Sequence, residues 1–509
     1  MSTLTALAKA QAVAAGRAQK IATVRHAHLS DLPLVFIPLT MAGEANAPLA
    51  VMVGTDENAP ELLIVPQPRD RGLRFQFAAR LAEVLLPYAE GFCSATEAVP
   101  TDRKRDVRYR YLEAPQIIVP APAGIGFVRL FGRSTRFRRT DGDYPVLPTV
   151  PLLGRWLTFF AERAEQPGSS MLLSLTELLS AHWATGQSGH EDAHLGSLVN
   201  WIAPPPGMTG AQAARLAEDP DVCPPAGPAT DPGFDNDVLG PAMDIYRAAA
   251  ESGDPEAERA AYQELEDLLH GQLAPTWELM WRGLRVMRAM PPGASVEARW
   301  AQDRDVFSDF SLYVQGGGAP QARRDGAVAA ATRLHKLERA GQSYAIERAF
   351  DDPLIMAEHR LGGEAIVGEV TLAAPDRVDD TGKRPVLRPR IQVVTTDPVL
   401  FPEGTTLVSP SKPQQKARVI FVTPVEDGDK TEVVLELNGG MGRGLRAPAG
   451  SVPEVGERIT YTSLSLGYAP PGTFPSREET PWTHGGPPQY SIADDPLDQG
   501  DHAATEDWS

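Results

Sequence analysis

The chain has 509 residues, which is more than one ordinary globular domain contains. Its hydrophobic fraction of 42 % and charged fraction of 22 % are typical of a folded soluble protein, and they exclude collagen-like, coiled-coil and wholly disordered classes. The net charge of −18 is unevenly distributed, because residues 1–200 are nearly neutral and the acidic excess lies in residues 201–509. The pattern along the chain predicts a multidomain α+β protein.

Residues 1–150 are predicted to form a mixed α/β domain. An alanine-rich helix comes first, and short runs of β-branched and large apolar residues bounded by turn residues then predict a three-stranded meander. Apolar residues at helical spacing from Phe75 to Leu85 predict a second helix, which Pro87 ends. The predicted strands of this domain are 34–37, 49–53, 62–65, 116–119 and 126–131.

Residues 151–350 are predicted to form an all-helical region, because apolar residues recur there at spacings of three and four. Clusters of Pro and Gly separate the segments, and residues 223–241 form a proline-rich loop. The predicted helices are 152–163, 171–183, 193–202, 242–250, 256–273, 276–290 and 321–348.

Residues 351–470 change to alternation with a period of two, which predicts five or six short strands and hence a small β-barrel. The last segment, 471–509, is rich in Asp, Glu and Pro and poor in apolar residues. We expect it to be a disordered acidic tail, because it cannot bury enough apolar surface to offset its ordering entropy. The predicted barrel strands are 365–372, 391–396, 418–423, 432–437 and 458–464.

A basic segment, 103–139, interleaves arginines with aromatic residues. Arginine neutralises phosphates and aromatic rings stack on bases, so this composition suits single-stranded nucleic acid. The alternation from Arg108 to Tyr111 places both arginines on one strand face. Alternatively, these arginines are solvated or pair with the acidic downstream part of the same chain. The residues predicted to contact phosphate are Arg105, Arg108, Arg110, Arg133, Arg136 and Arg138.

The stretch from His190 to His194 matches H-E-x-x-H, in which two histidines one helical turn apart bind zinc. Its context favours another interpretation, because Ser188 and Glu191 have the spacing of a capping box at a helix start. We therefore expect no metal and no cofactor, and we keep His190 and His194 as the candidate ligands should a metal bind.

The upstream order of a helix, three strands, a helix and a strand resembles the core of the restriction-like PD-(D/E)xK nucleases. That resemblance implies that Asp56 and Glu61 are metal ligands. The family also needs E-x-K on its third strand, whereas Leu62 and Leu63 follow Glu61 here. We therefore expect at most a degenerate, inactive nuclease core.

Several other sites are excluded by the sequence. No P-loop phosphate-binding motif and no G-x-S-x-G nucleophile elbow occur. Cys93 and Cys223 stand too far apart for a Cys-x-x-Cys pair. No run approaches the roughly 18 apolar residues of a membrane-spanning helix, so we expect no membrane association and a cytoplasmic protein.

A long helix that leads into a barrel, at about 321–464, resembles the stalk and β-barrel accessory domain of superfamily one nucleic-acid helicases. The sequence segments that carry this resemblance are 368–370, 388–393 and 433–441. The helicase motor motifs are absent from the chain. The resemblance implies an accessory subunit beside a separate motor, as in bacterial operons for DNA processing or anti-phage defence.

The sequence therefore favours a non-catalytic accessory or scaffold protein that binds a protein partner, such as a helicase or nuclease subunit, and single-stranded or duplex nucleic acid. Two alternatives remain open. One is a metal-dependent hydrolase or nuclease, and the other is a purely structural interaction protein whose basic and acidic halves close on each other.

Overall fold

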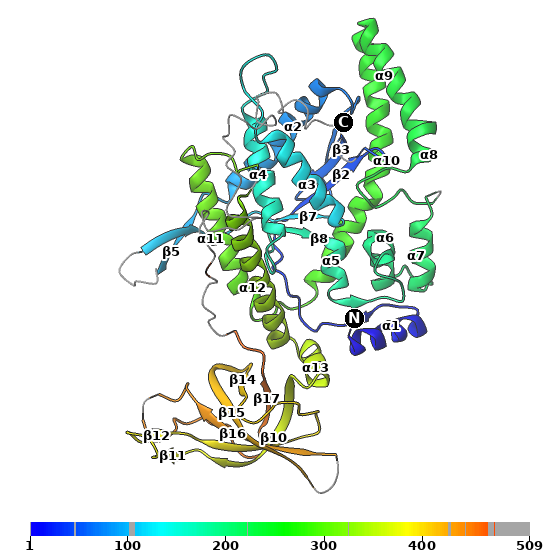
Figure 1. Cartoon of the computed structure of the whole chain (residues 1–509). Helices are drawn as coiled ribbons and strands as arrows, with labels where there is room; N and C mark the ends of the chain where they lie inside the picture. Colours follow the sequence, from blue (N-terminus) through cyan, green and yellow to red (C-terminus); the bar gives the residue numbers. More distant parts are fainter. Residues whose placement is uncertain are drawn as a thin grey trace, which may run out of the picture.

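The computed structural model describes residues 2–44, 47–100, 107–220, 222–323, 325–425, 429–442, 444–466 and 473. Within these residues the chain forms a mixed α/β body and a closed β-barrel carried on a helical stalk (Figure 1). The predicted fold class is thereby confirmed for the body and the barrel. The predicted acidic tail, 471–509, lies almost entirely outside the described residues.

The centre of the body is a five-stranded sheet with the order β4-β3-β2-β7-β8. The first three strands along the chain form the predicted antiparallel meander, and β7 lies parallel to both β2 and β8. Every residue of β2 is buried, because helices cover both faces of the sheet. The strands are β2 (Leu34–Thr40), β3 (Pro48–Gly54), β4 (Glu61–Ile64), β7 (Ile117–Val119) and β8 (Leu172–Ser174).

Alternate residues of β2 enter two different hydrophobic cores. Leu34 and Phe36 pack with one set of helices, and Val35 and Ile37 pack with another. The first set is α2 (Arg71–Gly91), α3 (Pro122–Thr135), α4 (Thr149–Ala164) and α11 (Val296–Gln315). The second is α5 (Leu175–Ser180), α6 (Leu195–Ile202), α9 (Gly240–Ser252) and α10 (Pro255–Arg288).

The strand predicted at 126–131 is wrong, because these residues lie in α3. Pro122 stands in the first turn of this helix, and Phe127 and Phe131, one turn apart, are both buried. Pro87 does not end α2, and Pro275 lies inside α10, which joins the two helices predicted at 256–273 and 276–290. Helix α11 was not predicted.

Most of residues 151–350 are helical, as predicted, but two short strands interrupt them. Strand β8 adds to the central sheet beside β7, and β9 (Trp183–Ala184) pairs with β1 (Gln19–Lys20) near the N-terminus. The helix predicted at 171–183 is therefore a strand followed by the short helix α5. The remaining body helices are α1 (Thr3–Ala15), α7 (Gly210–Glu218) and α8 (Pro232–Phe234). The loop predicted at 223–241 is wrong from residue 232 on, because α8 and the π-helix Asp235–Leu239 lead directly into α9.

The stalk consists of α12 (Ala327–Asp351) and α13 (Pro353–Leu361), which lead into the barrel. The barrel closes in the order β10-β13-β16-β15-β14-β17, and its inward side chains form a core of their own. Its strands are β10 (Ala365–Ala374), β13 (Arg390–Thr395), β14 (Thr406–Ser409), β15 (Lys412–Pro424), β16 (Thr431–Asn438) and β17 (Arg458–Thr462), and β11 (Val378–Asp379) and β12 (Val386–Leu387) form a separate hairpin.

The elbow between α12 and α13 fastens the stalk to the body. Asp351 accepts hydrogen bonds from the backbone N–H and the hydroxyl of Ser295, each at 2.9 Å. Asp352 is fully buried and accepts from the backbone N–H of Thr23 at 2.6 Å and from its hydroxyl at 3.0 Å. The elbow thus contacts the turn before α11 and the segment that follows β1.

None of the helices in the described ranges combines the length and the apolar content that crossing a membrane would need.

Candidate functional site

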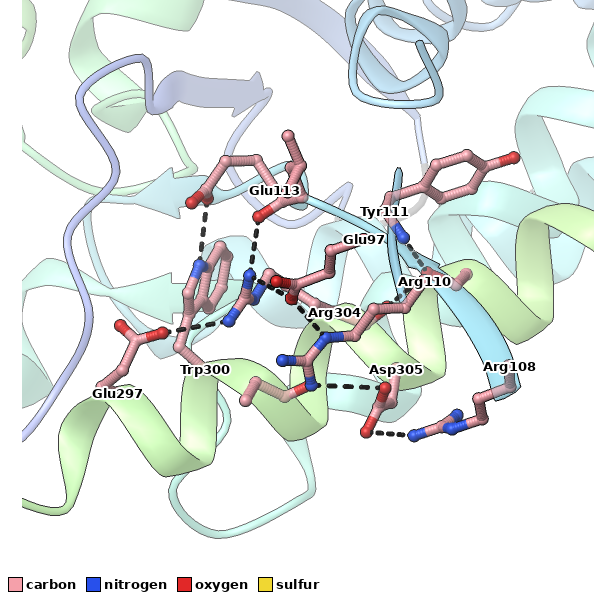
Figure 2. A network of polar contacts seen from close by, with 12 residues as sticks. Glu97, Arg108, Arg110, Tyr111, Glu113, Glu297, Trp300, Arg304 and Asp305 are labelled. Carbon is pink, nitrogen blue, oxygen red and sulfur yellow. Dashed lines mark hydrogen bonds and ion pairs between the residues drawn. The ribbon is translucent and has the colours of Figure 1, made fainter. Parts of the chain in front are cut away.

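Strand β6 (Val107–Tyr111) of the basic segment pairs with β5 (Thr96–Pro100), and this hairpin packs against α11 (Figure 2). Arg108 Nη2 lies 2.6 Å from Asp305 Oδ2, and Arg110 Nη1 lies 3.4 Å from Asp305 Oδ1. Both arginines therefore share one face of β6, as the alternation predicted. This arginine face of β6 pairs with Asp305 of the acidic downstream part of the same chain. Such pairing within the chain is the alternative to phosphate contact that the sequence left open.

A second layer of polar contacts joins this hairpin to α11. Arg304 is buried and donates to Glu97 at 3.0 Å, to the carbonyl of Leu112 at 2.8 Å and to Glu297 at 3.0 Å. Arg110 Nε donates to Glu97 at 2.7 Å, and this hydrogen bond is the main cause that lowers the pKa of the Glu97 carboxyl. A phosphate would have to displace these carboxylates, and phosphate contact by Arg108 and Arg110 stays a prediction.

The other predicted phosphate contacts have different surroundings. Arg105 lies outside the described residues. Arg138 donates to the carbonyl of Ser134 at 2.9 Å, and its guanidinium lies 5.1 Å from the ring centre of Phe75. Arg136 is buried, whereas Arg133 is exposed to solvent.

Arg133 and Arg136 line a depression of about 570 Å³ between α3, α4 and α12. We call it the arginine hollow. Its charged lining consists of five arginines and three acidic residues: Arg129, Arg133, Arg136, Arg323, Arg333, Glu162, Glu165 and Asp325. The lining therefore carries an excess of positive charge.

Two of the hollow's arginines are neutralised by carboxylates. Arg129 Nη2 lies 3.1 Å from Glu165, and Arg333 contacts both Glu165 at 2.8 Å and Asp325 at 3.2 Å. These exposed pairs are weak, because solvent screens them. Burial raises the pKa of Glu162, so this carboxylate binds a proton more readily than an exposed one.

Arg136 and Arg323 contact neutral groups at the hollow. Arg136 Nε donates to the carbonyl of Gln321 at 3.2 Å, and Nη2 donates to that of Ala322 at 3.1 Å. The guanidiniums of Arg136 and Arg323 each lie 4.8 Å from the ring centre of Phe137. The sequence does not reveal Arg323 and Arg333 as part of this site, because the fold brings them to α3 from almost 200 residues away.

The histidine pair does not form a zinc-binding helix face. His190 precedes a 3₁₀ turn (Glu191–Ala193), and His194 has extended backbone with φ −85° and ψ 112°. His194 Nδ1 accepts a hydrogen bond from the Ser197 N–H at 3.1 Å and so caps α6. The predicted reciprocal contacts are confirmed, since Ser188 N–H donates to Glu191 at 2.6 Å and Glu191 N–H donates to Ser188 at 3.3 Å. They stabilise the 3₁₀ turn, whereas α6 begins only at Leu195.

The candidate nuclease ligands lie around the turn between β3 and β4. Asp56 accepts from the backbone N–H of Asn58 at 2.9 Å, which is a turn contact, and Glu61 is an exposed residue at the start of β4. Over the described ranges, no three His, Cys, Asp or Glu side chains gather closely enough to hold a metal ion. The resemblance to the nuclease core stays a prediction.

Comparison of the chain with protein-family models, with curated proteins and with solved structures finds no match.

Proposed function

We propose that the protein is a non-catalytic accessory subunit that binds nucleic acid and holds it beside a protein partner. The observation that carries this proposal is the arginine hollow, in which Arg133 and Arg323 face the same depression from two distant parts of the chain. Guanidinium groups suit phosphate because each presents several N–H donors in one plane. The volume of about 570 Å³ is that of a site for a ligand the size of a nucleotide.

The barrel offers a second surface for the same strand. On its outer face, Arg390, Glu436 and Arg418 stand opposite one another on three neighbouring strands. In the next pair of outward-facing residues on β15 and β16, Phe421 is 41 % exposed and lies opposite Val434. An exposed aromatic ring beside cations can stack on a base while the cations contact phosphates.

The protein partner that we propose is a helicase or nuclease subunit of a bacterial DNA-processing or anti-phage defence complex in the cytoplasm. What supports this part of the proposal is the stalk that ends in a closed barrel, the arrangement anticipated from the resemblance to helicase accessory domains.

The proposal is tested by measuring the affinity for a fluorescein-labelled single-stranded DNA and for its duplex over a range of salt concentrations. We expect binding that weakens with salt. In the double variant Arg133→Glu/Arg323→Glu, the slope of log affinity against log salt should fall by about two, because each lost phosphate contact removes about one.

A matched control is Arg247→Glu/Arg259→Glu, which changes the net charge equally. Arg247 lies on α9 and Arg259 near the start of α10, on the side of the body away from α12 (Figure 1). We expect this variant to keep the slope of the unaltered protein. Equal losses in both variants would mean that only net charge matters, and absence of binding at low salt would make the hollow a surface for a protein.

A further inference from the structure

A groove of about 830 Å³ lies on the other side of the body, between α10, the helices α6 and α7, and the turn that joins β3 to β4. We call it the α10 groove. Its volume falls within the range of sites for small ligands. It contains none of the residues of the arginine hollow or of the hairpin network.

The walls of the α10 groove are largely apolar. The ring of Trp277 forms part of the floor, and its indole N–H donates to the carbonyl of Glu57 at 2.8 Å. Three large apolar side chains of the lining are exposed: Met208 by 43 %, Leu216 by 44 % and Val222 by 62 %. Three such side chains around one depression form a surface that an apolar ligand would cover.

One cation in the groove lacks an anionic partner. Arg282 is half-buried and donates to Asn200 Oδ1 at 3.0 Å and to the carbonyl of Ala203, both of which are neutral acceptors. Burial, and then the neighbouring charge of Arg285, lower the pKa of Arg282. No ion pair joins Arg282 to a carboxylate within the described part of the chain.

The other charged groups of the lining do not neutralise Arg282. Arg285 is itself paired with Glu57 through contacts of 2.6 and 2.8 Å. Glu278, the second acid of the groove, is exposed, so water screens its charge. A ligand anion beside Arg282 would supply the missing partner in a half-buried position, where an ion pair is stronger than at the surface.

We propose that the α10 groove binds a small organic acid whose carboxylate pairs with Arg282 and whose apolar body lies along Trp277 and Leu216. This site is independent of the nucleic-acid function proposed above. The cation fixes the head of the ligand, and the exposed apolar side chains at the rim cover its body.

The test uses 4-phenylbutyrate and its uncharged amide as matched probes in calorimetric titrations of the full chain. We expect one site for the acid, with affinity about tenfold weaker for the amide, a difference that corresponds to one partly buried ion pair. Arg282→Gln should abolish this preference for the acid.

A second readout uses Cys223, which lines the groove, and Cys93, which does not. The acid should slow alkylation of Cys223 and leave the rate at Cys93 unchanged. Because Arg282 also links α10 to the end of α6, Leu216→Asp at the rim serves as a second variant, with Ile245→Asp on α9 as its control.

We expect Leu216→Asp to lose protection of Cys223 and Ile245→Asp to keep it. Equal binding of the acid and the amide would overturn the proposal. It would also be overturned by unchanged alkylation of Cys223 with about 10 mM acid present, or by protection that persists in Leu216→Asp.

Discussion

At the scale of single residues, the arginines of the basic segment differ in what surrounds them. Arg110 lies between Glu97 and Asp305, whereas Arg133 is exposed and lines the arginine hollow. Periodicity in the sequence correctly placed Arg108 and Arg110 on one strand face. It could not reveal that Asp305, 195 residues beyond Arg110, lies against that face, because only helix packing brings them together.

His182 gives the buried core of the body a dependence on pH. Its ring is 1 % exposed, its Nδ1 lies 2.7 Å from the carbonyl of Leu178, and its Nε2 accepts from the backbone N–H of His26. Both ring nitrogens are thus satisfied in the neutral form. Burial lowers the pKa of His182 to about 4.

We predict that acidification destabilises the body between pH 6.5 and pH 4. In this window the unfolded state binds a proton that the folded state excludes, so the free energy of unfolding falls, for His182 alone, by up to about 3 kcal/mol. Urea unfolding followed by tryptophan fluorescence at pH 7 and pH 4.5 measures the loss. His182→Gln should lose less stability over this interval; an identical loss in the variant would contradict the assignment.

At the scale of elements, two glycines allow α3 and α4 to cross closely. A Cβ built on Gly132 would lie 2.8 Å from the backbone nitrogen of Thr158, and one on Gly154 would overlap the backbone of Arg136. Backbone atoms cannot move aside as a flexible side chain can. This close crossing also positions Arg136 at the arginine hollow.

We predict that Gly154→Ala lowers the free energy of unfolding of the body by about 3 kcal/mol, since the added methyl forces the two helices apart. Gly126→Ala is the control, because Gly126 lies in the partner helix α3 with open space around it. This control should raise stability by about 0.5 to 1 kcal/mol, the usual gain for alanine within a helix. Thermal and urea unfolding measure the stability of both variants. A Gly154→Ala variant as stable as Gly126→Ala would refute the close-crossing argument.

At the scale of the whole molecule, the body and the barrel have separate hydrophobic cores. The barrel core draws only on residues between Ile366 and Tyr461, and the two body cores draw on none of these. The stalk connects the two parts, with Asp351 and Asp352 as the contacts of its elbow to the body.

We predict two unfolding transitions, because parts with separate cores unfold independently unless a large interface couples them. Six of the chain's eight tryptophans lie between Trp156 and Trp300, in the body. Replacing Trp482 and Trp508 with Phe makes fluorescence follow the body, whereas far-ultraviolet circular dichroism follows both parts. The two signals should therefore have different midpoints. Coincident transitions, together with a single calorimetric peak, would show that the body and the barrel unfold as one unit.

Local patterns in the sequence were sufficient for the meander β2–β4, for α2 and for the alternating strands of the barrel. They were insufficient at 126–131, where Phe127 and Phe131 fit a strand or a helix equally until their burial against the sheet is known. They also missed β8, whose place in the sheet depends on β7, more than 50 residues earlier.

The sequence by itself determined the class of most elements, the reciprocal contacts of Ser188 and Glu191, and the separation of an α/β part from a barrel. These follow from the spacing of apolar and polar residues over a few turns or strands. Only the tertiary structure decided which arginines are neutralised and which face a hollow. Charge neutralisation acts over a few ångströms in space, and Asp305, Arg323 and Arg333 reach those positions only when α11 and α12 pack onto the upstream domain.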